Sequence, residues 1–149
     1  MKIFSRIMAL LVLVFFAGCA AQAGGGSSSA VSSSDKALAI TQPATLSNVN
    51  SPLKVCMVTN GYTVEPAKKG VNPGKGHHHL LIDSGIPADL GKPVAKDDTH
   101  IHMGDGSTCK TINLTKGQHT ITALFAQGNH VPFNPVVTDS VTVRVVQVN

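Results

Sequence analysis

The chain has 149 residues, enough for one folded domain and hardly for two. Its formal charge is +4 at pH 7, but Lys2 and Arg6 lie in an N-terminal leader, which leaves +2 for the rest. Because no Lys/Arg cluster is interleaved with aromatic residues, the composition argues against a nucleic-acid partner.

The first 18 residues are typical of a secretory signal peptide. Lys2 and Arg6 precede an apolar run from Ile7 to Phe16, and the small residues Ala17 and Gly18 follow. The run is too short for an ordinary membrane-spanning helix. We therefore expect residues 1–18 to be removed.

Cys19 comes directly after Ala17-Gly18, an arrangement that resembles the bacterial lipoprotein signal. The resemblance implies that Cys19 carries the lipid and anchors the mature chain to a membrane, the alternative being an ordinary cleavable signal or an uncleaved anchor. Ala20 follows where an aspartate would mark inner-membrane retention, which favours the outer membrane of a Gram-negative envelope. Residues 19–34 are rich in Gly and Ser and predict a flexible tether.

Residues 35–149 form the expected domain, and their pattern predicts an all-β fold. Short runs rich in Val, Thr and Ile alternate with turns containing Gly, Pro, Asn and Asp. The predicted strands are Ala37–Thr41, Leu53–Thr59, His77–Asp83, His100–Met103, Thr108–Leu114, Gln118–Ala126 and Ser140–Val148. The number of these strands and their spacing along the chain favour a single immunoglobulin-like antiparallel β-sandwich. Long loops are expected at 66–75, 84–98 and 128–135.

Cys56 and Cys109 remain once Cys19 is assigned to the lipid. Both fall in predicted strands, and a secreted domain lies in an oxidising compartment, so we expect a disulfide between them. It would close a loop of about 50 residues and stabilise the fold by about 4 kcal/mol in the chain-entropy view. The alternatives are a thiolate metal ligand and two free thiols.

Several motifs follow one another through the domain. They are GHHHLLID at 76–83, HIHMGDG at 100–106, KGQHTIT at 116–122, NHVP at 129–132 and SVTV at 140–143. This succession resembles the bacterial domain-of-unknown-function 4399 family, whose members are secreted or lipid-anchored. The resemblance implies a small β-sandwich in the cell envelope and no established activity. Cys56 and Cys109 depart from the family pattern.

All seven histidines lie in the C-terminal half of the chain. In a strand, His77 and His79 share one face, as do His100 and His102, with backbones about 7 Å apart. Neutral imidazole suits zinc, copper and nickel. We therefore predict a copper or zinc site. The first-choice ligands are His77, His79, His102 and His119, and the second choices are His78, His100 and His130.

Two other interpretations remain open. The histidines could contact a glycan, a peptide or another envelope protein, in which case they should be spread over a surface. They could also form a hydrogen-bonded network that holds loops to the sandwich. The sequence contains no nucleophile elbow, HExxH helix, phosphate loop or nucleotide fingerprint, so we expect a protein without catalytic activity.

Overall fold

The computed structural model describes residues 36–149. The expected signal peptide at 1–18, the lipid attachment at Cys19 and the tether at 19–34 lie outside the described residues. Within 36–149, no helix is long and apolar enough to cross a membrane.

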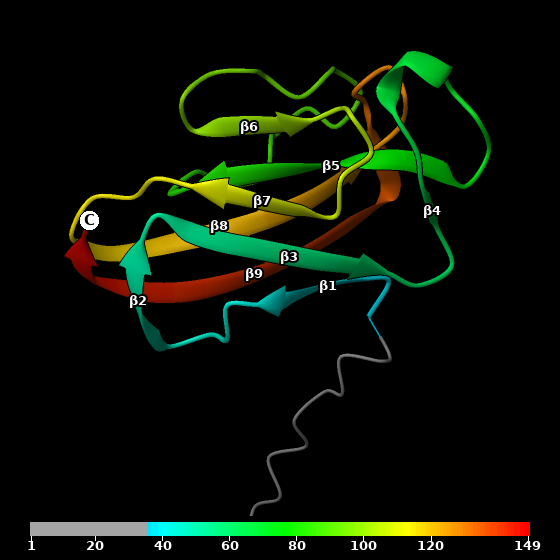
Figure 1. The fold of residues 1–149 in the computed structure, drawn as a ribbon. Coiled ribbons are helices and arrows are strands. Elements are labelled where there is room, and N and C mark those ends of the chain that lie inside the picture. The colour runs from blue at the N-terminus through cyan, green and yellow to red at the C-terminus, as the bar shows by residue number, and fades with distance from the viewer. Residues whose placement is uncertain (1–35) are drawn as a thin grey trace, which may run out of the picture. The chain divides into compact units, whose positions relative to one another are not determined.

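The described chain forms two β-sheets (Figure 1). The smaller sheet is antiparallel and has the order β1-β3-β7. The larger has the order β2-β9-β8-β5-β4, and β6 also pairs with β5. Its β2/β9 and β4/β5 pairs are parallel, so the larger sheet is mixed. The strands are β1 Leu38–Gln42, β2 Ser47–Ser51, β3 Leu53–Thr59, β4 Thr63–Val64, β5 Lys75–Ile82, β6 His100–Met103, β7 Cys109–Ile112, β8 Gly117–Ala126 and β9 Pro132–Val148.

The main hydrophobic core lies between the two sheets. It follows from the two-residue period of a strand: Val55 and Met57 of β3 are buried, whereas Lys54, before Val55, and Val58, after Met57, are exposed. From the larger sheet, alternate residues of β5 and β8 face the same core, including Leu80, Ile82, Ile121, Ala123 and Phe125. The all-β prediction is confirmed, but the prediction that all strands are antiparallel is wrong for the β2/β9 and β4/β5 pairs. The immunoglobulin-like topology stays a prediction.

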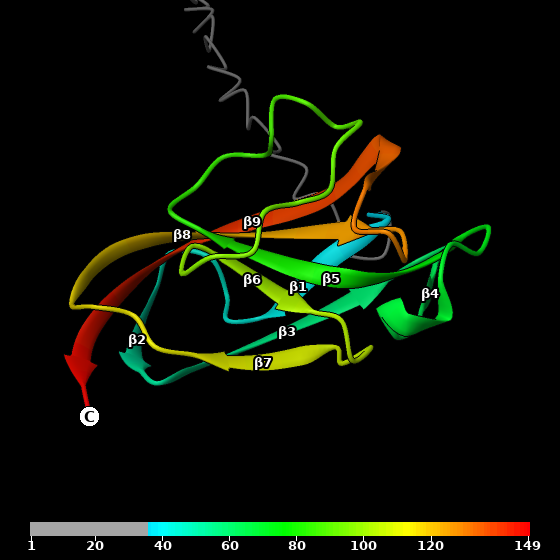
Figure 2. The ribbon, with the colours of Figure 1, turned by 90° about the horizontal axis from the view of Figure 1, so that it is seen from above.

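The outer face of the larger sheet, which carries the candidate site, is also partly buried. Figure 2 shows β3 and β7 on one side of β5 and β8, and the long loop between β5 and β6 on the other. Val94 of that loop packs with Leu81 and Leu124 in a second, smaller apolar cluster. As a result, β5 is buried on both faces from Gly76 to Ile82.

The strands β9 and β2 differ most from the sequence prediction. The strand expected at 140–148 begins at Pro132, because β9 pairs with the ten residues of β8, from Gly117↔Val145 to Ala126↔Pro132. A register irregularity between Phe125 and Ala126 fits the extra residues of this segment. The strand β2 was not predicted, because its polar sequence SNVNS has little β-propensity and its pairing partner β9 is distant in sequence.

The predicted disulfide is confirmed. Cys56 of β3 and Cys109 of β7 are direct partners in the antiparallel register and are bonded, at a sequence separation of 53. The bond therefore joins two neighbouring strands of the smaller sheet.

Replacing Cys56 and Cys109 together by alanine should lower the free energy of unfolding by about 4 kcal/mol, because the unfolded chain gains the entropy of an open loop of this length. Urea denaturation of the oxidised wild type and the double variant measures the difference. Reduction of the wild type should produce a similar loss. A difference below about 1 kcal/mol would show that the cross-link does little for stability.

Candidate metal centre

Two ligands of the candidate site come from one face of β5. His77 and His79 lie two residues apart on the outer face and are 0% and 1% exposed. On one side, His77 pairs with Ala126 and His79 with Leu124 of β8. On the other, His79 pairs with His102 of β6. The strand register thus brings three imidazoles to one end of the outer face.

A fourth imidazole comes from the turn that follows β8. That strand ends at Ala126, opposite His77, so the chain that continues from it passes beside the histidines of β5. His130 lies in this turn with a φ of 68°, in the left-handed region that non-glycine residues rarely adopt. Its carbonyl accepts a hydrogen bond from Val94 N–H, which fastens the turn to the outer loop. Such strained residues concentrate at functional sites.

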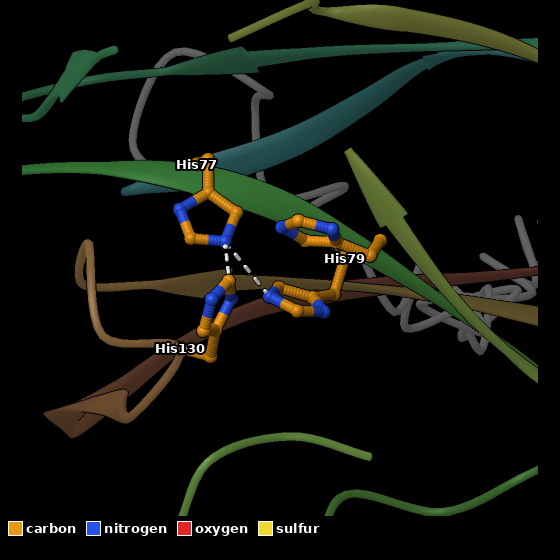
Figure 3. Close-up of side chains that lie close together, drawn as sticks. His77, His79 and His130 are labelled. Carbon is orange, nitrogen blue, oxygen red and sulfur yellow. Dashed lines mark hydrogen bonds between the residues drawn. The ribbon is translucent and has the colours of Figure 1, made fainter. Parts of the chain in front are cut away.

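The ring nitrogens of these four residues converge. Figure 3 shows His77, His79 and His130 pointing toward one another below β5. The Nε2 atom of His77 lies 3.1 Å from Nε2 of His79 and 3.1 Å from Nδ1 of His130. With His102 included, one ligand nitrogen from each residue lies within 4.8 Å of all the others.

The imidazole ring of His102 lies directly against Gly104. Its Nε2 atom is buried and has no hydrogen-bond partner among the described residues. A Cβ atom built on Gly104 would collide with Cε1 and Nε2 of the His102 ring. Only glycine at this position leaves room for the ring where it lies.

Gly104→Ala should therefore displace the His102 ring and weaken metal binding by about ten- to a hundredfold, the cost typical of losing the support of a ligand. The fold should survive, because the colliding atoms belong to a side chain that can rotate. Gly85→Ala is the matched control, since a Cβ atom there meets nothing within 4 Å. Calorimetric titration with Zn(II) compares the two variants. Wild-type affinity in Gly104→Ala would show that the position of His102 is unimportant.

Burial disfavours the charged form of His77, His79 and His102. Desolvation, followed by the nearby imidazoles of His102 and His130, lowers the pKa of His77 to about 4. Desolvation and then His77, His102 and His130 lower the pKa of His79 to about 3. Burial also lowers the pKa of His102. At pH 7 these rings are uncharged, which is the form that binds metal ions.

A pocket of about 240 Å³ opens onto the cluster. It is lined by His79, His102 and His130 and by two residues of the outer loop, Val94 and Lys96. His77 does not line it. Three of the four imidazoles thus face a space that a small molecule can enter.

His119, a first-choice ligand in the sequence analysis, is not brought to the cluster. It has the same parity along β8 as the core residues Ile121 and Ala123, so it belongs to the opposite face from His77 and His79. Its Nδ1 atom lies 2.7 Å from Asp83 Oδ2, and its Nε2 atom lies 2.8 Å from Thr115 O. Burial lowers the pKa of His119, but the hydrogen bonds to Asp83 and Thr115 together raise it by more, so the net pKa is raised.

Two second-choice residues also lie elsewhere. His78 faces the core, with its ring 5.1 Å from that of Phe125, and neither of its ring nitrogens has a hydrogen-bond partner within residues 36–149. His100 bridges Asp97 Oδ1, 2.9 Å from its Nδ1 atom, and Ser84 Oγ, 3.3 Å from its Nε2 atom. His100 therefore ties the end of the outer loop to its beginning. Only His130, of the second choices, joins the cluster.

A family model described as a domain of unknown function, DUF4399, matches residues 55–146. The match covers more than half of the chain and includes all four clustered histidines. No curated protein and no solved structure matches the chain. The family resemblance expected from the histidine motifs is confirmed, and the chain belongs to the DUF4399 family.

Proposed function

We propose that this chain is a lipid-anchored protein of the bacterial cell envelope that binds one transition-metal ion, copper or zinc, through His77, His79, His102 and His130. One observation carries the proposal: four imidazoles from three separate segments direct a nitrogen toward one point. A partner surface or a loop-pinning network has no need for such convergence.

The nitrogen separations support an ion at the centre. A tetrahedral ion with metal–nitrogen bonds of about 2.0–2.1 Å holds its ligand nitrogens about 3.3 Å apart. The two shortest separations here are 3.1 Å, and the longest, up to 4.8 Å, would shorten as the rings close on the ion. Without an ion, Nε2 of His77 faces two nitrogens but offers either one hydrogen or one lone pair. A metal ion removes this competition, because every ring then donates a lone pair to it.

The ligand set favours Zn(II) or Cu(II) over Cu(I). All four ligands are imidazole nitrogens, which suit borderline divalent ions, whereas Cu(I) prefers sulfur. Met57 and Met103, the soft donors that a Cu(I) site would use, are each 2% exposed and lie in the core between the sheets. Cys56 and Cys109 are bonded to each other.

Binding without catalysis is the simpler function for this set. A hydrolytic metal site also needs a general base beside the ion, and the cluster consists of imidazoles alone. The carboxylates of Glu65 and Asp83 are engaged elsewhere, with Asn72 and His119. The envelope location and the membrane anchor at Cys19 rest on the leader sequence, and an envelope protein that exchanges the ion is the expected partner.

Calorimetric titration tests the proposal. The full chain, purified without an affinity tag of histidines, is titrated with Zn(II) and with Cu(II). We expect one ion per chain and a sub-micromolar Kd, because four pre-positioned ligands lose little entropy on binding. Binding no tighter than that of a surface histidine pair would refute the metal site, and the histidines would then be assigned to scaffold or partner contacts.

A further inference from the structure

The proposed site lacks negative charge. Four neutral imidazoles leave both positive charges of a divalent ion uncompensated. Among the residues that line the pocket, Lys96 adds a third positive charge, and none is a carboxylate. Asp105 follows three residues after His102 and its charge acts on that ring, but it does not line the pocket, and its exposed carboxylate accepts hydrogen bonds from Ser107. A partly desolvated charge of this size is unfavourable unless an anion accompanies it.

The pocket is placed to admit that anion. It reaches three of the four imidazoles, so an ion held by the cluster would have one side toward it. Lys96 lines the pocket from a loop that is anchored nearby, since Val94 is buried and its N–H donates a hydrogen bond to the carbonyl of His130. At about 240 Å³, the space is large enough for a few non-hydrogen atoms and too small for a folded partner.

We infer that the metal-loaded protein binds a small anion through its oxygen atoms, a carboxylate or an inorganic oxyanion, between the ion and Lys96. The inference rests on the proposed metal site. The anion's oxygen adds one ligand on the open side of the ion and accepts a hydrogen bond from the Lys96 ammonium. Val94 contributes an apolar wall that a short organic acid would contact.

Anion titrations of the Cu(II)-loaded full chain test the inference. Sodium acetate and sodium phosphate are added separately, and the Cu(II) visible absorption and electron paramagnetic resonance spectra are recorded. We expect a saturable change of both spectra with at least one anion, while the ion stays bound. A response to acetate alone identifies a carboxylate site, and a response to phosphate alone identifies an inorganic oxyanion site.

Lys96→Gln should weaken the apparent affinity of the Cu(II)-loaded chain for the anion about fivefold, the effect of losing one exposed ion pair. Lys96→Glu should weaken it further, because it places a negative charge in the pocket. Lys54→Gln is the matched control, since Lys54 is an exposed residue of β3 in the other sheet.

The outcomes separate the two proposals. Tight Cu(II) binding with spectra that neither anion alters would overturn the anion site and leave the metal site standing. An anion response that is equal in Lys96→Gln and wild type would overturn the role of Lys96. Absence of Cu(II) binding would overturn both.

Discussion

A chain in which His77 and His79 are both replaced by alanine should bind Zn(II) and Cu(II) at least a hundredfold more weakly than the wild type. The pair supplies two of the four converging nitrogens, and both come from one rigid strand that is paired on both sides. Losing the support of a single ligand already costs about ten- to a hundredfold in metal affinity. The remaining residues, His102 and His130, would form no more than a two-ligand site. Calorimetric titration measures the loss.

The double variant His100→Ala/His119→Ala is its matched control. It removes the same number of imidazoles from the same domain, but both contact aspartates away from the cluster. We expect it to keep the wild-type metal affinity. If the two double variants lost affinity equally, metal binding would depend on the total number of histidines, and the four-residue site would be wrong.

The second large effect concerns acid. We expect the metal-free protein to lose stability steeply as the pH falls from about 6.5 toward 4. The loss of stability in acid follows from three buried histidines. Burial lowers the pKa from 6.5 to about 4 for His77, to about 4 for His78 and to about 3 for His79. Between these values and 6.5, the unfolded chain binds protons that the folded chain excludes, so protons favour unfolding. The stability is fully present above pH 6.5.

The expected loss of folding free energy in acid is large compared with the stability of a small domain. His78 is the simplest case, because burial alone lowers its pKa. A decrease to about 4 corresponds to a loss on the order of 3 kcal/mol once the pH falls below that value. His77 and His79 add losses of the same sign, and only roughly 5–15 kcal/mol holds a typical domain folded. His119 acts in the opposite direction, because its pKa is raised: its stabilising contribution is fully present below pH 6.5 and is lost as the pH rises through the raised pKa.

Circular dichroism during acid titration, with a chelator present, measures the midpoint. His78→Leu is the informative variant, because it keeps an apolar side chain against Phe125 and removes one titrating group. It should unfold at a lower pH than the wild type while its stability at pH 8 stays within about 1 kcal/mol. An unchanged acid midpoint would show that buried histidines do not control acid unfolding.

Strand periodicity predicted the part of the site that lies on strands. His77 and His79, and separately His102, could be placed because alternate residues of a strand share a face. That His102 would lie opposite His79 depends on the pairing of β5 with β6 across a long loop, which no local pattern encodes. The same holds for the disulfide, where the residue pair could be predicted but the β3–β7 register could not.

Whether His119 or His130 is the fourth ligand could be decided only from the pairing of β5 with β8. His119 alternates with Ile121 and Ala123, and this pattern in the sequence was a signal that it shares the core face. His130 lies in a turn, where periodicity carries no information. Its place follows from Ala126 lying opposite His77, which brings the next turn over the outer face. His130 has a left-handed backbone in a turn closed by the hydrogen bond from its N–H to the carbonyl of Gln127, and its own carbonyl accepts a hydrogen bond from Val94 N–H.

X-ray absorption at the zinc edge, recorded on the Zn(II)-loaded chain in a buffer without coordinating anions, tests the four-histidine site most directly. We expect a first shell of four nitrogens at about 2.0 Å with the outer-shell scattering of imidazole rings. The His77→Ala/His79→Ala variant should lose that pattern. A first shell made mainly of oxygen, or an imidazole signal that the variant leaves unchanged, would contradict the site.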